Sequence, residues 1–242
     1  MRAASRTDIG NIRENNEDVL YSSIDPVGNL PNLFLVADGM GGHKAGEVAS
    51  RSAMEFFLKY IGEAPCNDGE LLDYMTEAVK YANNAVFELS LTDMAYFGMG
   101  TTLSACVVAD GKVFIAHIGD SRIYLVNSGK LQQLTNDHTF VGEMVRAGQF
   151  SKEEAERHPS KNALTRALGV ERDVSADAPV AAVTSGDMLL LCSDGLNNMV
   201  TENDIVKILT SNKDVEKKAD TLIERAKKNG GMDNITVVVI EV

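Results

Sequence analysis

Short apolar runs that end in an aspartate constrain this chain most strongly. Residues 33–37 are apolar throughout, and Asp38-Gly39 closes the run before further glycines. A run of this length closed by glycine is typical of a buried strand, and glycine lets the backbone come close to a small charged group. A single aspartate at such a place is commonly a turn or cap residue. The same design recurs, however, with Asp120 after residues 113–118, Asp194 after residues 188–192, and Asp233 before residues 235–242.

The remaining hydrophobic pattern predicts an α+β domain. Residues 47–61 and 68–90 carry apolar side chains at helical spacing, whereas residues 98–135 contain short strand-like runs. Asp110-Gly111 inside the second region is typical of a tight hairpin turn, so we expect a β-meander there. We further expect a hairpin joining residues 179–183 to 188–192, helices at 201–209 and 215–228, and a closing strand at 235–242. Grouped strands and grouped helices favour one layered domain over residues 1–242 and argue against a parallel βαβ sheet.

Two polar stretches complete the predicted domain. Turn residues between positions 26 and 31 predict that a strand near residues 19–21 returns antiparallel into the run at 33–37. Residues 136–169 are poor in apolar side chains and rich in charge, and they include a Ser151-x-x-Glu154 capping box. Such an excursion between two β regions predicts a surface flap, which would carry specificity rather than core packing.

Composition excludes several classes of protein. With 44% hydrophobic residues, the 242-residue chain can bury one sizeable core, but no stretch approaches the ~20 apolar residues of a membrane span. We therefore expect no membrane partner and a cytoplasmic location. The three cysteines, Cys66, Cys106 and Cys192, lack metal-ligand spacing and are expected to be reduced core residues. A net charge of −12 disfavours nucleic acid as a partner.

An acidic protein that handles phosphate needs a local reversal of charge, which bound divalent cations supply. If they meet in space, the strand-end aspartates together with Asp18 and the Gly39 carbonyl form a ligand set made only of oxygen. Mg²⁺ and Mn²⁺ prefer such ligands, whereas zinc more often takes His or Cys. Two ions ~3.5–4 Å apart could activate a bridging water for attack on phosphorus. The set predicts a two-ion site with metal ligands Asp18, Asp38, Gly39, Asp120, Asp194 and Asp233.

Two further residues have both a functional and an ordinary interpretation. Arg13 could clamp a substrate phosphate, because its planar guanidinium donates two parallel hydrogen bonds; alternatively it forms a surface salt bridge with Glu14 or Glu17. His43 could protonate the departing alkoxide, or it could be an exposed loop histidine. Asp38 and His43 are the predicted catalytic residues.

The motifs in their chain order resemble the metal-dependent type 2C protein serine/threonine phosphatases in their short bacterial form. The resemblance spans almost the whole sequence. It rests on Arg13-x-x-Asn16-Glu17-Asp18, the stretch from Val36 to His43, Gly100-Thr101-Thr102, Gly119-Asp120-Ser121-Arg122, the stretch from Leu164 to Gly169, Ser193-Asp194-Gly195 and Asp233-Asn234-Ile235-Thr236. It implies a four-layer α/β/β/α sandwich of two antiparallel sheets flanked by helix pairs, with the metal site at one end.

The resemblance also implies individual metal roles. Asp38 would bridge two metals, with the Gly39 carbonyl on one of them and Asp194 and Asp233 on the other. Asp18 would act through water, and Asp120 with Asp194 would hold a weaker third ion. The eukaryotic branch has a histidine directly after its Asp-Gly pair, where Met40 stands here. The general acid is therefore less well defined by the motif than the metal ligands are.

Hydrolysis of phosphoserine and phosphothreonine in proteins, opposing a serine/threonine kinase, is the predicted function. The partners would be phosphorylated proteins and that kinase. One alternative is a regulatory module of the same fold that binds phosphoproteins without turnover, although none of the expected ligands is missing. Another is a structural Ca²⁺ protein, which the absence of an EF-hand loop spacing disfavours.

Overall fold

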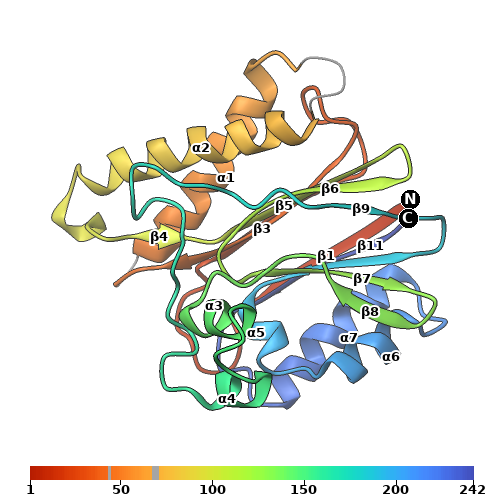
Figure 1. The fold of residues 1–242 in the computed structure, drawn as a ribbon. Coiled ribbons are helices and arrows are strands. Elements are labelled where there is room, and N and C mark those ends of the chain that lie inside the picture. Colours follow the sequence, from red (N-terminus) through yellow and green to blue (C-terminus); the bar gives the residue numbers. More distant parts are fainter. Residues whose placement is uncertain (43–44, 67–70) are drawn as a thin grey trace.

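Two antiparallel sheets packed face to face form the centre of the protein, and helices cover both outer surfaces (Figure 1). The computed structural model describes residues 1–42, 45–66 and 71–242, without the side chains of residues 152 and 156. One sheet has the order β1 (Arg2–Asp8), β11 (Ile235–Glu241), β10 (Met188–Cys192), β7 (Arg122–Asn127) and β8 (Lys130–Gln133). The other has the order β2 (Asp18–Ser23), β3 (Leu33–Met40), β5 (Leu103–Ala109), β6 (Lys112–Ile118) and β9 (Val180–Ala182), with β4 (Gly100–Thr101) pairing with β3.

Each sheet carries its own pair of helices. Helices α1 (Ala45–Glu63) and α2 (Leu71–Ser90) pack on the sheet that contains β3, and α6 (Glu202–Leu209) and α7 (Val215–Lys228) pack on the sheet that contains β11. The four-layer sandwich is therefore confirmed. Shorter helices lie between the strands in sequence: η1 (Met94–Tyr96), α3 (Phe140–Arg146), α4 (Lys152–Arg157) and α5 (Asp194–Asn197). Among the described residues, no helix combines the length and the hydropathy that a membrane crossing requires.

The central strands are apolar on both faces because each face is covered. In β3, Leu33, Leu35 and Ala37 pack against α1 and α2, whereas Phe34 and Val36 pack between the sheets. This alternation follows from the two-residue period of a strand. It explains why the strands appear in the sequence as continuous apolar runs rather than alternating ones. Cys106 and Cys192 lie in these cores, as predicted, while Cys66 is only partly buried.

Two predicted pairings are wrong. β9 and β10 do not form a hairpin, because β9 pairs with β6 and β10 lies between β7 and β11. All five residues of β10 are buried, so this strand takes a central place with neighbours on both sides. The meander at 98–135 is also two separate hairpins: β5 and β6 belong to one sheet, and β7 and β8 to the other. The chain changes sheets at Gly119, where φ is +106°.

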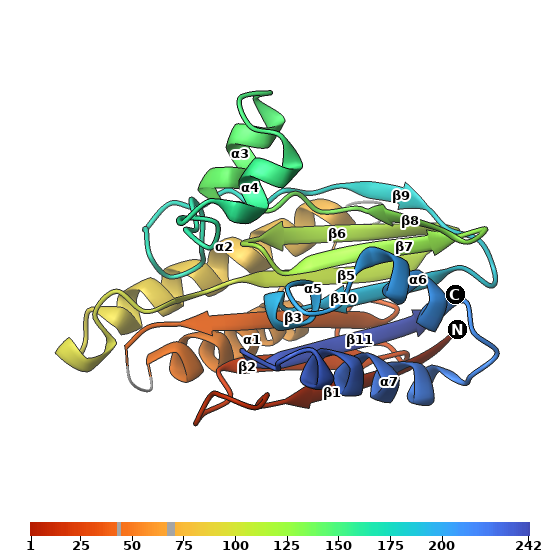
Figure 2. The ribbon, with the colours of Figure 1, turned by 90° about the horizontal axis from the view of Figure 1, so that it is seen from below.

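The predicted flap contains α3 and α4, which stand at the side of the sandwich (Figure 2). Ser151 and Glu154 form the capping box predicted for α4. An isolated bridge between Thr139 and Leu164 closes the base of the flap. The flap therefore begins and ends at one point of the sandwich, next to the turn that carries Asp120.

Candidate metal centre

Asp38 continues the row of β3 side chains that points between the two sheets. It follows Phe34 and Val36 at the two-residue spacing, and the strand register places Asp18 of β2 directly opposite it. Thr102 fixes its backbone: the Thr102 Oγ1 accepts from the Asp38 N–H at 2.9 Å, and the Thr102 N–H donates to the Asp38 carbonyl at 2.9 Å. Like charges directly opposite in a sheet repel each other. The Asp18–Asp38 pair therefore requires a cation or protons.

Gly39 of β3 lies where this strand comes closest to the start of α1 and to Glu17, the residue before β2. A Cβ at this position would lie 2.0 Å from the Gly46 carbonyl oxygen and 2.8 Å from the Glu17 carbonyl oxygen. The Gly39 N–H donates to the Glu17 carbonyl at 3.1 Å. Any side chain here would force these segments apart, so glycine is required by space.

Asp194 reaches the same end of the sandwich from the other sheet, as the first residue of α5. The helix packs tightly on the start of β11, since a Cβ at Gly195 would lie 2.0 Å from the Asn234 carbonyl oxygen. The Asn198 Nδ2 donates to Asp194 Oδ2 at 3.0 Å. Just before the helix, the Ser193 hydroxyl donates to Asp18 Oδ2 at 2.7 Å. Ser193 thereby connects the two sheets at the site.

Asp120 lies in the turn where the chain changes sheets, and buried His138 holds that turn. The His138 Nδ1 accepts from the Gly119 N–H at 3.1 Å, and the His138 N–H donates to the Gly119 carbonyl at 2.8 Å. His138 also accepts at its carbonyl from the Thr165 N–H at 2.8 Å. Its Nε2 lies 3.1 Å from Asp177 Oδ2 without the alignment of a hydrogen bond. His138 therefore connects the base of the flap to the Asp120 turn.

The electrostatics show that the five aspartates lie close enough for their charges to raise the pKa values of four of them. Burial raises the pKa of Asp38, and the charges of Asp18, Asp194, Asp120 and Asp233 raise it further. The pKa of Asp18 rises to about 7, first through burial and then through Asp194 and Asp233, against the lowering effect of its hydrogen bonds. Burial and Asp194 raise the pKa of Asp120 to about 7, and burial and Asp233 raise that of Asp194 to about 6.

The residues present fit divalent cations. Asp18 Oδ1 is buried and has no hydrogen-bond partner among the described residues, and such an orphaned charged oxygen is costly unless a ligand satisfies it. The converging donors are carboxylates, which Mg²⁺ and Mn²⁺ prefer. Within the described part of the chain, no three His, Cys, Asp or Glu side chains are already assembled as a ligand cluster. The fit therefore rests on the orphaned oxygen, the donor chemistry and the shared field.

Arg13 lies at the rim of this site. Its Nη2 donates to Asp233 Oδ2 at 2.7 Å, and the side chain is 48% exposed. The predicted salt-bridge alternative is thus realised with a different partner from Glu14 or Glu17. This ion pair joins two segments that are far apart in the sequence. His43, the predicted general acid, lies outside the described residues.

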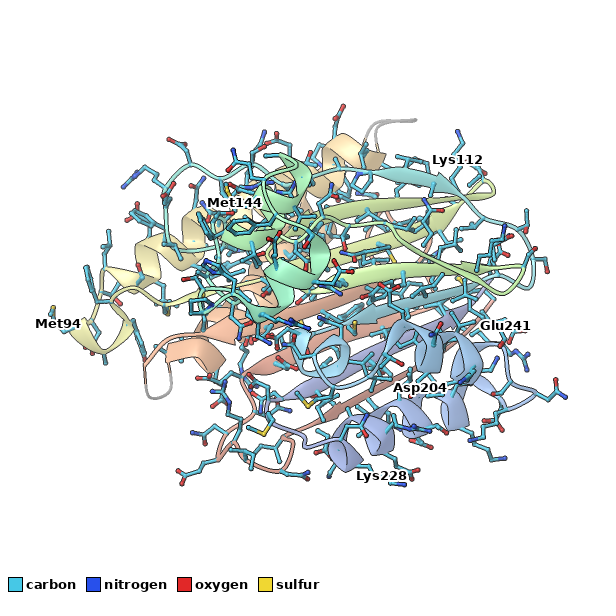
Figure 3. The ribbon with its side chains drawn as sticks, turned by 60° about the horizontal axis from the view of Figure 1, so that its bottom comes forward. Met94, Lys112, Met144, Asp204, Lys228 and Glu241 are labelled. Atoms are coloured by element: carbon cyan, nitrogen blue, oxygen red, sulfur yellow. The ribbon has the colours of Figure 1, made fainter. Side chains whose placement is uncertain are left out.

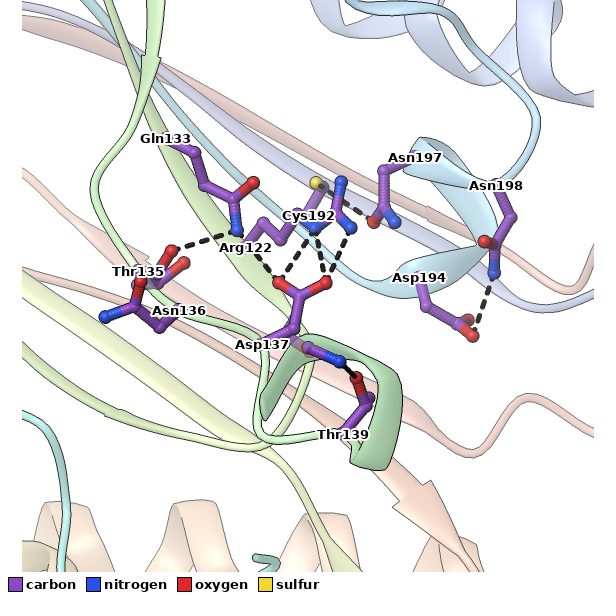
Figure 4. A network of polar contacts seen from close by, with 12 residues as sticks. Arg122, Gln133, Thr135, Asn136, Asp137, Thr139, Cys192, Asp194, Asn197 and Asn198 are labelled. Carbon is purple, nitrogen blue, oxygen red and sulfur yellow. Dashed lines mark hydrogen bonds and ion pairs between the residues drawn. The ribbon is translucent and has the colours of Figure 1, made fainter. Parts of the chain in front are cut away.

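A cleft of about 410 Å³ extends from the aspartates to the flap. Asp120 and Asp194 line one end of it, and Val141 and Val145 of α3 line the flap side. In its wall the Arg122 guanidinium forms a bidentate ion pair with Asp137, with contacts of 2.6–3.1 Å (Figure 4). The cleft can hold atoms that flank a phosphoryl group at the acidic site.

Sequence reasoning gave no role to several residues that build this site. Ser193 bonds Asp18, Thr102 fixes Asp38, and the Asn234 Oδ1 accepts from the Glu17 N–H at 2.8 Å. Each of these polar residues is buried beside a strand end. Their signal was present in the motifs, where Ser193 and Asn234 each stand next to an aspartate and Thr102 stands in Gly100-Thr101-Thr102, but their partners are distant in sequence.

Comparisons with known proteins agree with this architecture. The sandwich with aspartates at one end is the form of a type 2C phosphatase, and residues 13–235 match the family model described as Protein phosphatase 2C. The chain therefore belongs to the protein phosphatase 2C family. It is 44% identical to the serine/threonine phosphatase stp of Listeria monocytogenes, across 100% of this chain and 96% of the relative. It is 38% identical to the protein phosphatase PhpP of Streptococcus pneumoniae, across 99% and 97% of the two chains.

Solved structures show the same fold. The serine/threonine phosphatase of S. agalactiae superposes with a TM-score of 0.92 at 38% identity, covering 100% of this chain and 99% of that one. The Mycobacterium tuberculosis phosphatase PstP/Ppp superposes with a TM-score of 0.89 at 39% identity, covering 100% of this chain and 98% of that one. A PstP catalytic domain described in complex with two manganese ions superposes with a TM-score of 0.86 at 38% identity, covering 99% of this chain and 97% of that one.

Proposed function

We propose that this protein hydrolyses phosphoserine and phosphothreonine in proteins with the help of divalent cations. The observation that carries the proposal is the meeting of five aspartates from both sheets at one end of the sandwich, where the buried Asp18 Oδ1 has no hydrogen-bond partner in the described part of the chain. Full-length similarity to proteins named as serine/threonine phosphatases supports the same reaction. A regulatory module without turnover is not favoured, because every predicted ligand residue is present.

The cations would be held by Asp38, the Gly39 carbonyl, Asp194 and Asp233, with Asp18 acting through water and Asp120 serving a weaker third ion. Divalent cations of this kind supply a water of lowered pKa as nucleophile and offset the charge of the phosphoryl oxygens. The chain itself holds the acids in place. Thr102 fixes the Asp38 backbone and Ser193 orients Asp18.

Substrate phosphate would be bound by Arg13. Only its Nη2 is used in the pair with Asp233, and its other N–H groups have no partner among the described residues. They can donate to phosphate oxygens while the ion pair holds the side chain at the rim. His43 is proposed to give the leaving alkoxide its proton, since imidazole titrates near neutral pH.

The finer features of the function are further proposals. We propose manganese as the bound metal, because a structural relative is described with two manganese ions. The cleft beside Asp120 and Asp194 has room for residues flanking the phosphorylated one, which suits a protein substrate phosphorylated by a serine/threonine kinase. A part in signalling and a cytoplasmic location stay predictions of the sequence.

Turnover with and without metal tests the function. We expect an aryl phosphate and a phosphothreonine peptide to be hydrolysed with Mn²⁺ and not with a chelator. Asp38→Asn and Asp194→Asn should lose nearly all activity, whereas Asp25→Asn in an exposed loop should keep it. Phosphopeptide binding without turnover would instead establish the regulatory module. Turnover that survives the chelator would refute the metal-dependent reaction.

A further inference from the structure

Lys218 occupies a core position of α7. The buried positions of this helix are Val215, Lys218, Ala219, Leu222, Ile223 and Ala226. They follow the three- and four-residue spacing of one helix face. All of them except Lys218 are apolar, and Lys218 is itself only 7% exposed. An ammonium group therefore stands where the pattern requires an apolar side chain.

Among the described residues, no acidic side chain forms an ion pair with the Lys218 ammonium. The hydrogen-bond partner of its Nζ among the described residues is the Met188 sulfur at 3.8 Å, and a thioether is a weak acceptor. Burying an unpaired charge is strongly unfavourable. Such a position is tolerated when a ligand of opposite charge balances it.

A cavity of about 280 Å³ adjoins this ammonium. Lys218 and Met188 line it, together with Ser128, Gly129 and Gly186. A Cβ at either glycine would meet nothing within 4 Å, so the backbone there leaves the space open. The cavity can thus admit a small molecule beside Lys218.

One acidic side chain also lines the cavity, but its charge is already balanced. Glu241 Oε2 forms an ion pair of 2.6 Å with Arg2, and the Glu241 side chain is 29% exposed. Among the described residues that line the cavity, the Lys218 ammonium is therefore the charged group without an ion-pair partner. Glu241 marks this end of the molecule in Figure 3, away from Met144 of the flap.

The cavity lies at the far end of the sandwich from the aspartates. Val126 and Ser128 lie at the end of β7 opposite the Asp120 turn, and Met188 begins β10, which ends before Asp194. Glu241 ends β11, which starts after Asp233. The cavity is therefore a separate place from the metal centre.

We propose that this cavity is a binding site for a small oxyanion, a carboxylate or a phosphate, which pairs with the Lys218 ammonium. The exposed Ser128 hydroxyl supplies a further polar contact for its oxygens. The proposal does not depend on the catalytic function.

Methionine methyl NMR of the full chain with Mg²⁺ tests the site. Met188 reports occupancy because its sulfur touches the Lys218 nitrogen. Sodium phosphate and sodium acetate are titrated at ionic strength held constant with sodium chloride. We expect the Met188 methyl resonance to shift saturably in the wild type and in Lys228→Leu, an exposed lysine of the same helix. Lys218→Leu should need at least tenfold more anion for the same shift.

The two anions identify the source: saturation by phosphate alone assigns a phosphate site, and saturation by acetate alone assigns a carboxylate site. Hydrolysis of an aryl phosphate within twofold of the wild-type rate checks that Lys218→Leu folds. If that variant fails to fold, the titration of the wild type still tests the proposal, because the site requires a saturable Met188 shift. Absence of any saturable Met188 shift overturns the proposal, and so does an equal shift in Lys218→Leu.

Discussion

Replacing Asp18 by asparagine should stabilise the metal-free protein. The pKa of Asp18 is raised from its ordinary 3.8 to about 7, and each tenfold change in proton affinity is worth 1.36 kcal/mol, so the charged form costs up to about 4 kcal/mol. Asparagine removes this charge and keeps an oxygen that can accept from the Ser193 hydroxyl. Neighbouring aspartates take up protons when Asp18 is charged, which reduces this cost. We therefore expect Asp18→Asn to raise the free energy of unfolding by about 2 kcal/mol, which corresponds to a rise in Tm of roughly 4–8 °C.

The sign of this effect depends on pH. Unfolded Asp18 loses its proton near pH 3.8, whereas in the fold it keeps the proton until about pH 7. Between these values the folded state binds more protons, so the stability of the wild type falls as pH rises. The advantage of Asp18→Asn should therefore be absent near pH 4, grow up to pH 7 and then stay constant.

Thermal unfolding followed by circular dichroism in EDTA, at pH 4.5 and 7.5, measures this difference. Asp25→Asn, in an exposed loop, is the control and should match the wild type at both pH values. Saturating Mn²⁺ should abolish the gain, because the cation offsets the same charge. An Asp18→Asn protein that melts at or below the wild-type temperature at pH 7.5 in EDTA would refute the repulsion argument and make Asp18 a structural residue.

Three further variants separate the roles of the surrounding residues. Arg13→Ala should raise KM by ~10- to 150-fold, the equivalent of the ~1.5–3 kcal/mol of charged hydrogen bonds; a collapse of Mn²⁺ affinity at constant KM would show that Arg13 only supports its aspartate partner. His43→Ala should lower kcat for an alkyl phosphopeptide more than for an aryl phosphate, whose leaving group needs less protonation; equal effects would exclude a general acid. Replacing Val141, Met144 and Val145 together by alanine should change the ratio of kcat/KM for the peptide and the aryl phosphate several-fold with metal affinity kept, whereas equal losses with a lower Tm would indicate packing alone.

The parts of the fold that local sequence determines were predictable. The run at residues 33–37 needs a covered strand, and its period places Asp38 near the end of that strand, which continues to Met40. The helical spacing of apolar residues likewise predicted α1 and α7, because it depends only on residues within each helix. The positions of the aspartates at strand ends follow from these local signals, and so does the capping box at Ser151.

The hairpins β2–β3 and β5–β6 were predicted correctly from their turns. Pairings between strands that are distant in the sequence were not predictable, because no local signal specifies them. β1 has one buried residue, Ala4, and its other residues are exposed or half-buried, so it lacks an apolar run. It is a strand because it pairs with β11 at the other end of the chain. Likewise, Arg13 meets Asp233 and Ser193 meets Asp18 only after the two sheets pack.

Anomalous diffraction from crystals grown with Mn²⁺ tests the central claim most directly. That claim is that aspartates from both sheets form one cation site for phosphate ester hydrolysis. We predict manganese peaks within coordination distance of Asp38, Asp194 and Asp233, and loss of those peaks together with turnover in Asp38→Ala. An active protein whose crystals show no manganese at these carboxylates would contradict the account.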